Sequence, residues 1–141
     1  MRIQFVCLLL VLLSASVLSQ KAKLKRRYMK FINQHIDKRM SVDKCDDVMR
    51  AKINKINCKK TNTFIQSNNQ TVKSICGNKG EPYGDMTKSL QRFDIVVCEL
   101  KEQTRPKKCH YNGKKLNKKI IIKCVEGFPV HYDGDIGHCE N

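Results

Sequence analysis

The sequence predicts a single α+β domain in which three helices of the N-terminal half pack on a mainly antiparallel β-sheet, stapled by disulfides. Apolar residues recur at helical spacing before Gly77, whereas residues 93–100 and 119–125 are rich in β-branched side chains. Helices followed by strands are typical of α+β folds. The chain shows no internal repeat and no low-complexity linker, so we expect one domain over residues 28–141.

Residues 1–19 have the features of a secretory signal peptide. Arg2 precedes an apolar run from Ile3 to Leu13, and the small residues Val17 and Ser19 suit cleavage after Ser19. The apolar run is shorter than the roughly 20 residues that a membrane span needs. We therefore expect a secreted, extracellular protein without a membrane anchor.

Residues 20–27 form a basic arm with too few apolar side chains to pack, so we expect a mobile, solvated tail. Removal of residues 1–19 takes Arg2 from the 28 basic residues and none of the 13 acidic ones, so the net charge falls from +15 to +14. Such a charge favours polyanionic partners, namely nucleic acid such as RNA, anionic membrane surfaces or cell-surface glycans. Charge alone does not distinguish among these partners.

The spacing of apolar residues predicts three helices. The first begins at Tyr28, the second fits residues 43–56, and a shorter third fits residues 69–76, where Asn69 can cap the first turn. The apolar positions are Ile32, Ile36 and Met40, with Phe31 and His35 alongside, in the first helix, and Val48, Ala51, Ile53 and Ile56 in the second.

Beyond Gly77 the pattern is that of strands. Residues 93–100 and 119–125 are each expected to form one. Asn112-Gly113 predicts a hairpin turn, because both residue types tolerate the positive φ of a tight turn. Asn69-Gln70-Thr71 is a sequon for N-glycosylation, and its use is left open.

Seven of the eight cysteines lie beyond the signal peptide. In a small secreted domain they predict a disulfide framework, although spacing alone leaves the pairing open. A structural zinc site is the competing interpretation, but no C-x-x-C pair is present and the four histidines are scattered, so we expect no metal. The seven are Cys45, Cys58, Cys76, Cys98, Cys109, Cys124 and Cys139.

Three short segments carry chemically versatile residues: 30–35 ends in Gln-His, 58–64 reads C-K-K-T-N-T-F, and 130–133 reads V-H-Y-D. Together they resemble the pancreatic ribonuclease superfamily, whose signature C-K-x-x-N-T-F is matched without a gap by residues 58–64. The likeness spans roughly Tyr28 to Asp135. It implies the fold of that family, with helices on a bent antiparallel sheet, and cleavage of RNA without a metal or cofactor.

RNA cleavage of this kind needs one group to take a proton from the 2′-hydroxyl and another to protonate the departing 5′-oxygen. Two histidines suit that work near neutral pH. By resemblance, His35 is the general base and His131 the general acid, and single-stranded RNA is cut 3′ of pyrimidines through a 2′,3′-cyclic phosphate. Lys59 matches the lysine that stabilises negative charge in the transition state. Alone, His35 would more often be a packing histidine, but three matches fall in the family's order.

The resemblance also implies a substrate-binding set. Gln34 matches a phosphate-contacting glutamine, Thr63 the residue that reads pyrimidine edges, and Asp133 the carboxylate that hydrogen-bonds the acid histidine. His110 and His138 have no such match and are interpreted as ordinary surface or strand residues. The predicted substrate-binding residues are Lys30, Gln34, Asn62, Thr63, Tyr132 and Asp133.

By the same resemblance the disulfides join Cys45 to Cys98, Cys58 to Cys109 and Cys76 to Cys124. A fourth bridge of the digestive enzymes has no cysteines here, and residues 77–84 occupy its region, which indicates the angiogenin-like branch. Cys139 then lacks a partner within the chain, so it is free, capped by a small thiol or joined to another chain. We otherwise expect a monomer.

Two other functions stand beside RNA cleavage. One is a cationic, antibacterial host-defence protein and the other an angiogenin-like signalling protein with weak ribonuclease activity. The arm and the lysines Lys114, Lys115, Lys118 and Lys119 favour the first, although a solvated face that assists RNA binding explains them better. In the angiogenin-like branch, C-terminal residues can obstruct the base pocket. Gly134 has no side chain to insert after Asp133, so we expect an open pocket.

Overall fold

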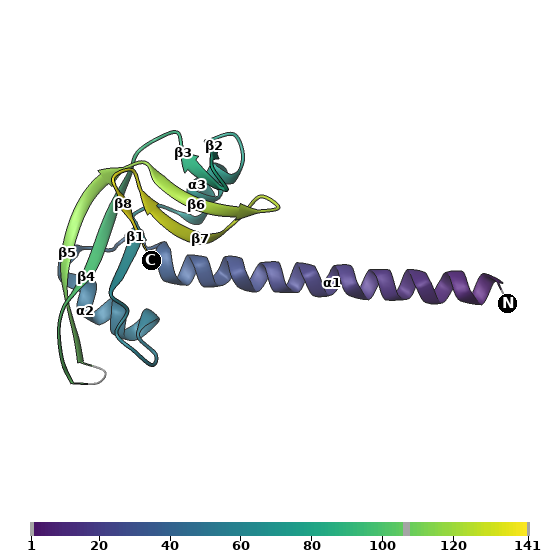
Figure 1. Ribbon diagram of the computed structural model, residues 1–141, viewed down its shortest axis with the longest axis horizontal. Helices are drawn as coiled ribbons and strands as arrows, with labels where there is room; N and C mark the ends of the chain where they lie inside the picture. The colour runs from purple at the N-terminus through teal and green to yellow at the C-terminus, as the bar shows by residue number, and fades with distance from the viewer. Residues whose placement is uncertain (1, 106–107, 141) are drawn as a thin grey trace.

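The computed structural model describes residues 2–105 and 108–140. One long helix, α1 (Arg2–His35), leads into a body of short helices and two antiparallel sheets (Figure 1). The sheet β1-β4-β5 consists of β1 (Thr61–Ile65), β4 (Phe93–Arg105) and β5 (Lys108–Lys118). The sheet β2-β3-β6-β7-β8 consists of β2 (Gly80–Tyr83), β3 (Met86–Ser89), β6 (Ile120–Val125), β7 (Phe128–Asp135) and β8 (His138–Cys139). The predicted α+β class is confirmed.

The basic arm does not form the mobile tail that we expected. It is helical and continuous with the rest of α1, although most of its side chains are exposed. Lysine, arginine, alanine and leucine all favour helix. The Tyr28 ring also packs on Phe128 of β7, with 5.1 Å between ring centroids, which holds this part of α1 against the sheet.

The first helix also ends earlier than its apolar stripe suggests. His35 is its last residue, because the next residues pair with β1: Ile36 forms a parallel bridge to Ile65, and the Asp37 amide donates to the Ile65 carbonyl at 3.0 Å. Met40 is still buried, but it lies outside the helix.

The second helix, predicted over residues 43–56, is shorter than predicted, and residues other than the predicted ones face the core. It consists of a 3₁₀ turn η1 (Val42–Lys44), α2 (Cys45–Val48) and a π turn η2 (Met49–Ile53). The inward residues are Cys45 and Met49, one turn apart, whereas Ile56 is 81% exposed. The disulfide from Cys45 to Cys98 of β4 explains this face, because it fixes which side of α2 meets the sheet.

Two further expectations are corrected. The third helix is α3 (Asn69–Lys73), followed by the 3₁₀ turn η3 (Ser74–Cys76), and its cap is Asn68, whose side chain accepts from the Thr71 amide at 2.7 Å. Asn112-Gly113 is no turn but lies inside β5. Glycine is needed there for another reason, since a Cβ at Gly113 would overlap the backbone of Val42.

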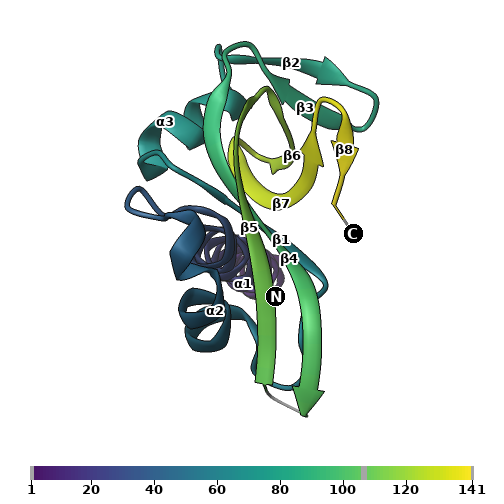
Figure 2. The ribbon, with the colours of Figure 1, turned by 90° about the vertical axis from the view of Figure 1, so that its left-hand side faces the viewer.

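The core lies where α1 and α3 pack on the sheets. A larger cluster includes Phe31, Ile95 and Ile122, and a smaller one under α2 includes Met49 and Phe64. Figure 2, with α1 seen nearly end-on, shows α2 beside the β4–β5 hairpin. Three disulfides join Cys45 to Cys98, Cys58 to Cys109 and Cys76 to Cys124.

Candidate active site

His35 sits at the end of α1 with its ring almost fully buried. It lies between the rings of Phe31 and Tyr132, at centroid distances of 5.4 and 5.2 Å. Its Nδ1 lies 2.9 Å from the carbonyl oxygen of Thr63 in β1. Because a carbonyl can only accept, Nδ1 carries the proton and the neutral ring leaves Nε2 as the basic nitrogen.

The surroundings of His35 keep the ring neutral. Burial is the main reason that the pKa of His35 is lowered from 6.5 to about 3; the positive charges of Lys59 and His131 add to this effect, while the Thr63 carbonyl opposes it. His35 and His131 line one cavity, and Lys59 is linked through Asn62 to Gln34 beside His35, so the three predicted catalytic residues lie in one region of the structure. A ring in this state is uncharged at any pH near neutrality, so the lone pair of Nε2 is free.

The side chain of Lys59 is held by two consecutive hydrogen bonds that connect it to α1. Its Nζ donates to Oδ1 of Asn62 at 2.9 Å, and Nδ2 of Asn62 donates to the carbonyl of Gln34 at 2.8 Å. Burial lowers the pKa of the Lys59 ammonium, and the nearby Glu140 carboxylate opposes that effect. The asparagine predicted to bind substrate therefore also fixes the ammonium relative to the helix of His35.

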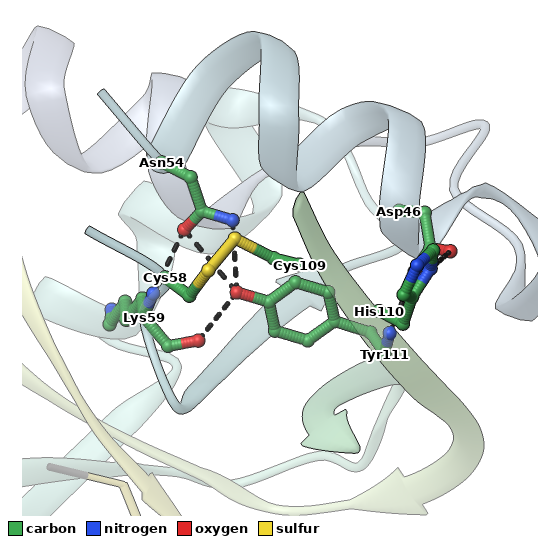
Figure 3. The surroundings of a disulfide bond; sticks show 7 residues. All are labelled: Asp46, Asn54, Cys58, Lys59, Cys109, His110 and Tyr111. Atoms are coloured by element: carbon green, nitrogen blue, oxygen red, sulfur yellow. Dashed lines mark hydrogen bonds and ion pairs between the residues drawn. A yellow bond between two sulfur atoms is a disulfide. The ribbon is translucent and has the colours of Figure 1, made fainter. Parts of the chain in front are cut away.

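The backbone of Lys59 is held as firmly as its side chain (Figure 3). Its amide donates to Oδ1 of Asn54 at 2.9 Å, and its carbonyl accepts from the Tyr111 hydroxyl at 2.6 Å. The preceding residue, Cys58, is joined by a disulfide to Cys109 in β5. These contacts leave Lys59, the predicted catalytic lysine, little freedom to move. Asn54 and Tyr111 were not among the predicted site residues.

His131 lies on β7 and faces solvent, with its side chain 53% exposed. Its Nε2 is 3.8 Å from Oδ1 of Asp133, so the two form an ion pair when the ring is charged and not the hydrogen bond that the resemblance implied. A small cavity of about 190 Å³ connects this histidine to α1. Its lining is Arg27, Lys30, Phe31, Gln34, His35, Val130 and His131.

The position beside Thr63 that the resemblance assigns to the base is not open, contrary to our expectation, because Glu140 lies there. Oε1 of Glu140 accepts from the Thr63 amide at 3.1 Å and lies 3.8 Å from Nζ of Lys59. Burial raises the pKa of the Glu140 carboxyl, against the opposing effects of Thr63 and Lys59. Gly134 allows this arrangement, since a Cβ there would overlap the carbonyl of His138 and push β8 away.

The remaining predicted residues lie around the two histidines, whereas His110, for which no role was predicted, does not. Lys30 and Gln34 line the cavity of the histidines, and the ring of Tyr132 covers His35. His110 lies elsewhere, 3.2 Å from Asp46 near α2. Among residues 2–105 and 108–140, no three histidine, cysteine or carboxylate side chains gather as a metal site would require.

Comparison with known proteins supports the same interpretation. Residues 26–133 match the family model of pancreatic ribonuclease. The chain is 35% identical over 136 residues to "Ribonuclease-like 3" of Danio rerio, with 91% of each chain covered, and 36% identical to "Angiogenin-3" of Mus musculus, with 89% of this chain and 90% of the relative covered. The solved structure of zebrafish RNase5 superposes with a TM-score of 0.75 and 39% identity, covering 79% of this chain and 96% of that one. The chain belongs to the pancreatic ribonuclease family, as a pancreatic-type endoribonuclease of its angiogenin-like branch.

Proposed function

We propose that the protein is a secreted endoribonuclease that cleaves single-stranded RNA 3′ of pyrimidines without a metal ion. The observation that carries this proposal is the hydrogen bond from His35 to the Thr63 carbonyl, which fixes the ring in the region of Lys59 and His131. Its Nδ1 proton is committed to Thr63, so Nε2 is the nitrogen that can take the proton of a 2′-hydroxyl. A ring in that state, close to the charges of Lys59 and His131, suits attack on a phosphodiester.

The reaction follows from these positions. As the 2′-oxygen attacks phosphorus, Nε2 of His35 accepts its proton, and His131 protonates the departing 5′-oxygen, which leaves a 2′,3′-cyclic phosphate. The ammonium of Lys59 stabilises the negative charge that grows on the phosphoryl oxygens. Water then opens the cyclic phosphate with the histidines in exchanged roles. Lys30 and Gln34 bind neighbouring phosphate groups from the wall of the cavity.

The contacts of Glu140 indicate slower RNA cleavage than the catalytic residues alone would give. Its carboxylate holds the Thr63 amide, which would otherwise bind the carbonyl of a pyrimidine, and it lies near Lys59. A base must therefore displace Glu140 before it is bound. Slow RNA cleavage, with a signalling or host-defence role, is the second candidate function that this contact supports.

The proposal extends to the chain ends and partners. We infer that residues 1–19 are removed on secretion, because from Cys7 onward they form an exposed apolar part of α1, apolar enough to cross a membrane, as signal sequences also are. The mature protein is a monomer that binds RNA, and its exposed lysines attract anionic membranes or glycans. The exposed thiol of Cys139 is open to capping or to pairing with another chain.

The decisive experiment is an assay of the purified, oxidised protein on polycytidylate and polyuridylate in the presence of a chelator. We expect both to be cleaved and a cyclic phosphate to accumulate before hydrolysis. A His35→Asn variant, prepared in the same way, controls for contaminating nucleases and should be inactive. Loss of activity with chelator, or equal activity of the variant, contradicts the proposal.

A further inference from the structure

The Tyr132 hydroxyl is a polar group that the reaction described above does not use. Tyr132 lies on β7 between His131 and Asp133, but its side chain points the other way and is only 2% exposed. Its ring stacks on His35, a role that phenylalanine would fill equally well. The hydroxyl oxygen is buried and makes no hydrogen bond of ordinary geometry among the described residues, although the Thr63 side chain lies beside it as a hydrogen-bonding neighbour. A buried hydroxyl without a partner is unfavourable, so its presence needs a reason.

The position of this hydroxyl supplies the reason. The polar side chains around it are those of Thr63, Glu140 and Asp135. It therefore faces the base pocket that Glu140 now fills, and Oε2 of Glu140 also lacks a partner there. When Glu140 leaves, the Tyr132 hydroxyl keeps two polar neighbours, the Thr63 side chain and the Asp135 carboxylate. Of these two, Thr63 also presents its amide to the position that Glu140 vacates.

The amide and the hydroxyl of Thr63 differ in what they can recognise. The Thr63 amide only donates, so it binds the carbonyl shared by both pyrimidines and does not tell them apart. The adjoining ring nitrogen is an acceptor in cytosine and a donor in uracil. The Thr63 hydroxyl can match either, unless a neighbour fixes the direction of its proton.

We propose that the Tyr132 hydroxyl fixes that direction by donating to the Thr63 oxygen, which turns the Thr63 proton toward the base and selects cytosine over uracil. This inference rests on the proposed function of the site. Burial, with the charges of Glu140 and Asp135, raises the pKa of Tyr132, so the hydroxyl keeps its proton and remains a donor. Tyr132 is thus a specificity-determining residue that acts through Thr63.

The test compares Tyr132→Phe with the wild type on cytidylyl-adenosine and uridylyl-adenosine. We expect the ratio of kcat/KM values, cytosine over uracil, to fall about fivefold, the factor of one neutral hydrogen bond. Tyr83→Phe removes a half-exposed hydroxyl elsewhere and should leave the ratio unchanged. In a Thr63→Val background, Tyr132→Phe should have no further effect, because the group through which it acts is gone.

Binding measurements separate this inference from the proposed function. The dissociation constants of cytidine 3′-phosphate and uridine 3′-phosphate, measured by calorimetry in wild-type and Glu140→Ala backgrounds, should show the same loss of preference in Tyr132→Phe without any turnover. If RNA is cleaved but neither ratio responds to Tyr132→Phe, or the preference moves toward cytosine, the inference is wrong and the proposed function stands. If the nucleotides bind with a Tyr132-dependent preference but no RNA is cleaved, the proposed function fails and the inference stands. Absence of binding in both backgrounds overturns the inference.

Discussion

The two walls of the active site are built in different ways. On the wall of α1 and β1, His35 is buried and Lys59 is hydrogen-bonded through its amide, carbonyl and ammonium groups. On the wall of β7, His131 is half exposed and its nearest carboxylate, from Asp133, is 3.8 Å away. A base that must stay neutral benefits from burial, whereas an acid that must regain a proton from water needs exposure. The asymmetry therefore matches the two roles proposed for the histidines.

The largest effect on activity should come from removing the charge of Lys59 on the wall of α1 and β1. We expect Lys59→Ala to lower kcat about 10³-fold, since an ammonium that stabilises developing charge acts mainly in the transition state. Binding of cytidine 3′-phosphate should change far less. Lys60→Ala removes the same charge from the next, exposed residue and is the matched control. A loss of binding as large as the loss of kcat would mean that Lys59 only anchors phosphate.

The burial of His35 should also make the stability of the fold sensitive to acid. The pKa of His35 is 6.5 in the unfolded chain and about 3 in the folded one, so between these values only the unfolded chain takes up the proton. Stability is therefore complete above pH 6.5 and falls as the pH is lowered toward 3, by about 1.4 kcal/mol per pH unit for this one group. Glu140, with its raised pKa, acts in the opposite sense above its ordinary value.

Urea unfolding of the oxidised protein from pH 7 to pH 4 measures this slope. His35→Gln should flatten it, because glutamine does not titrate. An identical slope in wild type and His35→Gln would mean that His35 is protonated in the folded protein.

Local sequence patterns predicted those features of the wall of α1 and β1, and of the strand beside it, that depend only on residues close together in the sequence. The run of β-branched residues at 93–100 lies within β4, and the motif at 58–64 contains Lys59, Asn62 and Thr63 together. The catalytic roles of these residues remain predictions. Their proximity to His35 follows from the pairing of Ile36 with β1.

The features that sequence reasoning missed depend on contacts between distant segments. Glu140 reaches Thr63 only because the chain turns at residues 136–137 and β8 pairs back along β7, where Gly134 leaves room for it, and no local pattern reveals a contact across 77 residues. Gly113 has the pattern of a turn, but it is needed for the close approach of Val42. The known obstruction of base pockets in the angiogenin-like branch was the one signal that pointed to the C-terminus.

A smaller effect should come from loosening the support of Lys59. Tyr111→Phe leaves the Lys59 carbonyl without its donor, so we expect a loss of about 2 kcal/mol in unfolding free energy and a decrease in kcat of more than tenfold. Tyr83→Phe is the control for loss of a hydroxyl at the surface. Equilibrium unfolding and steady-state kinetics give the two numbers. If stability falls while kcat holds, Tyr111 stabilises the fold without positioning the lysine.

The smallest effect should be a gain in activity, on removal of the Glu140 carboxylate that contacts Thr63 and Lys59. Glu140→Ala frees the Thr63 amide and removes the carboxylate from Lys59, so we expect kcat/KM on cytidylyl-adenosine to rise about tenfold, the factor of one hydrogen bond to a charged group. Glu140→Gln keeps the acceptor oxygen and the bulk but loses the charge, so it should rise less. Glu126→Ala removes an exposed carboxylate and corrects for the change in attraction to RNA. If Glu140→Ala, Glu140→Gln and Glu126→Ala have equal kcat/KM values, Glu140 leaves the pocket freely. The wall of β7, with His131, would then alone limit the rate.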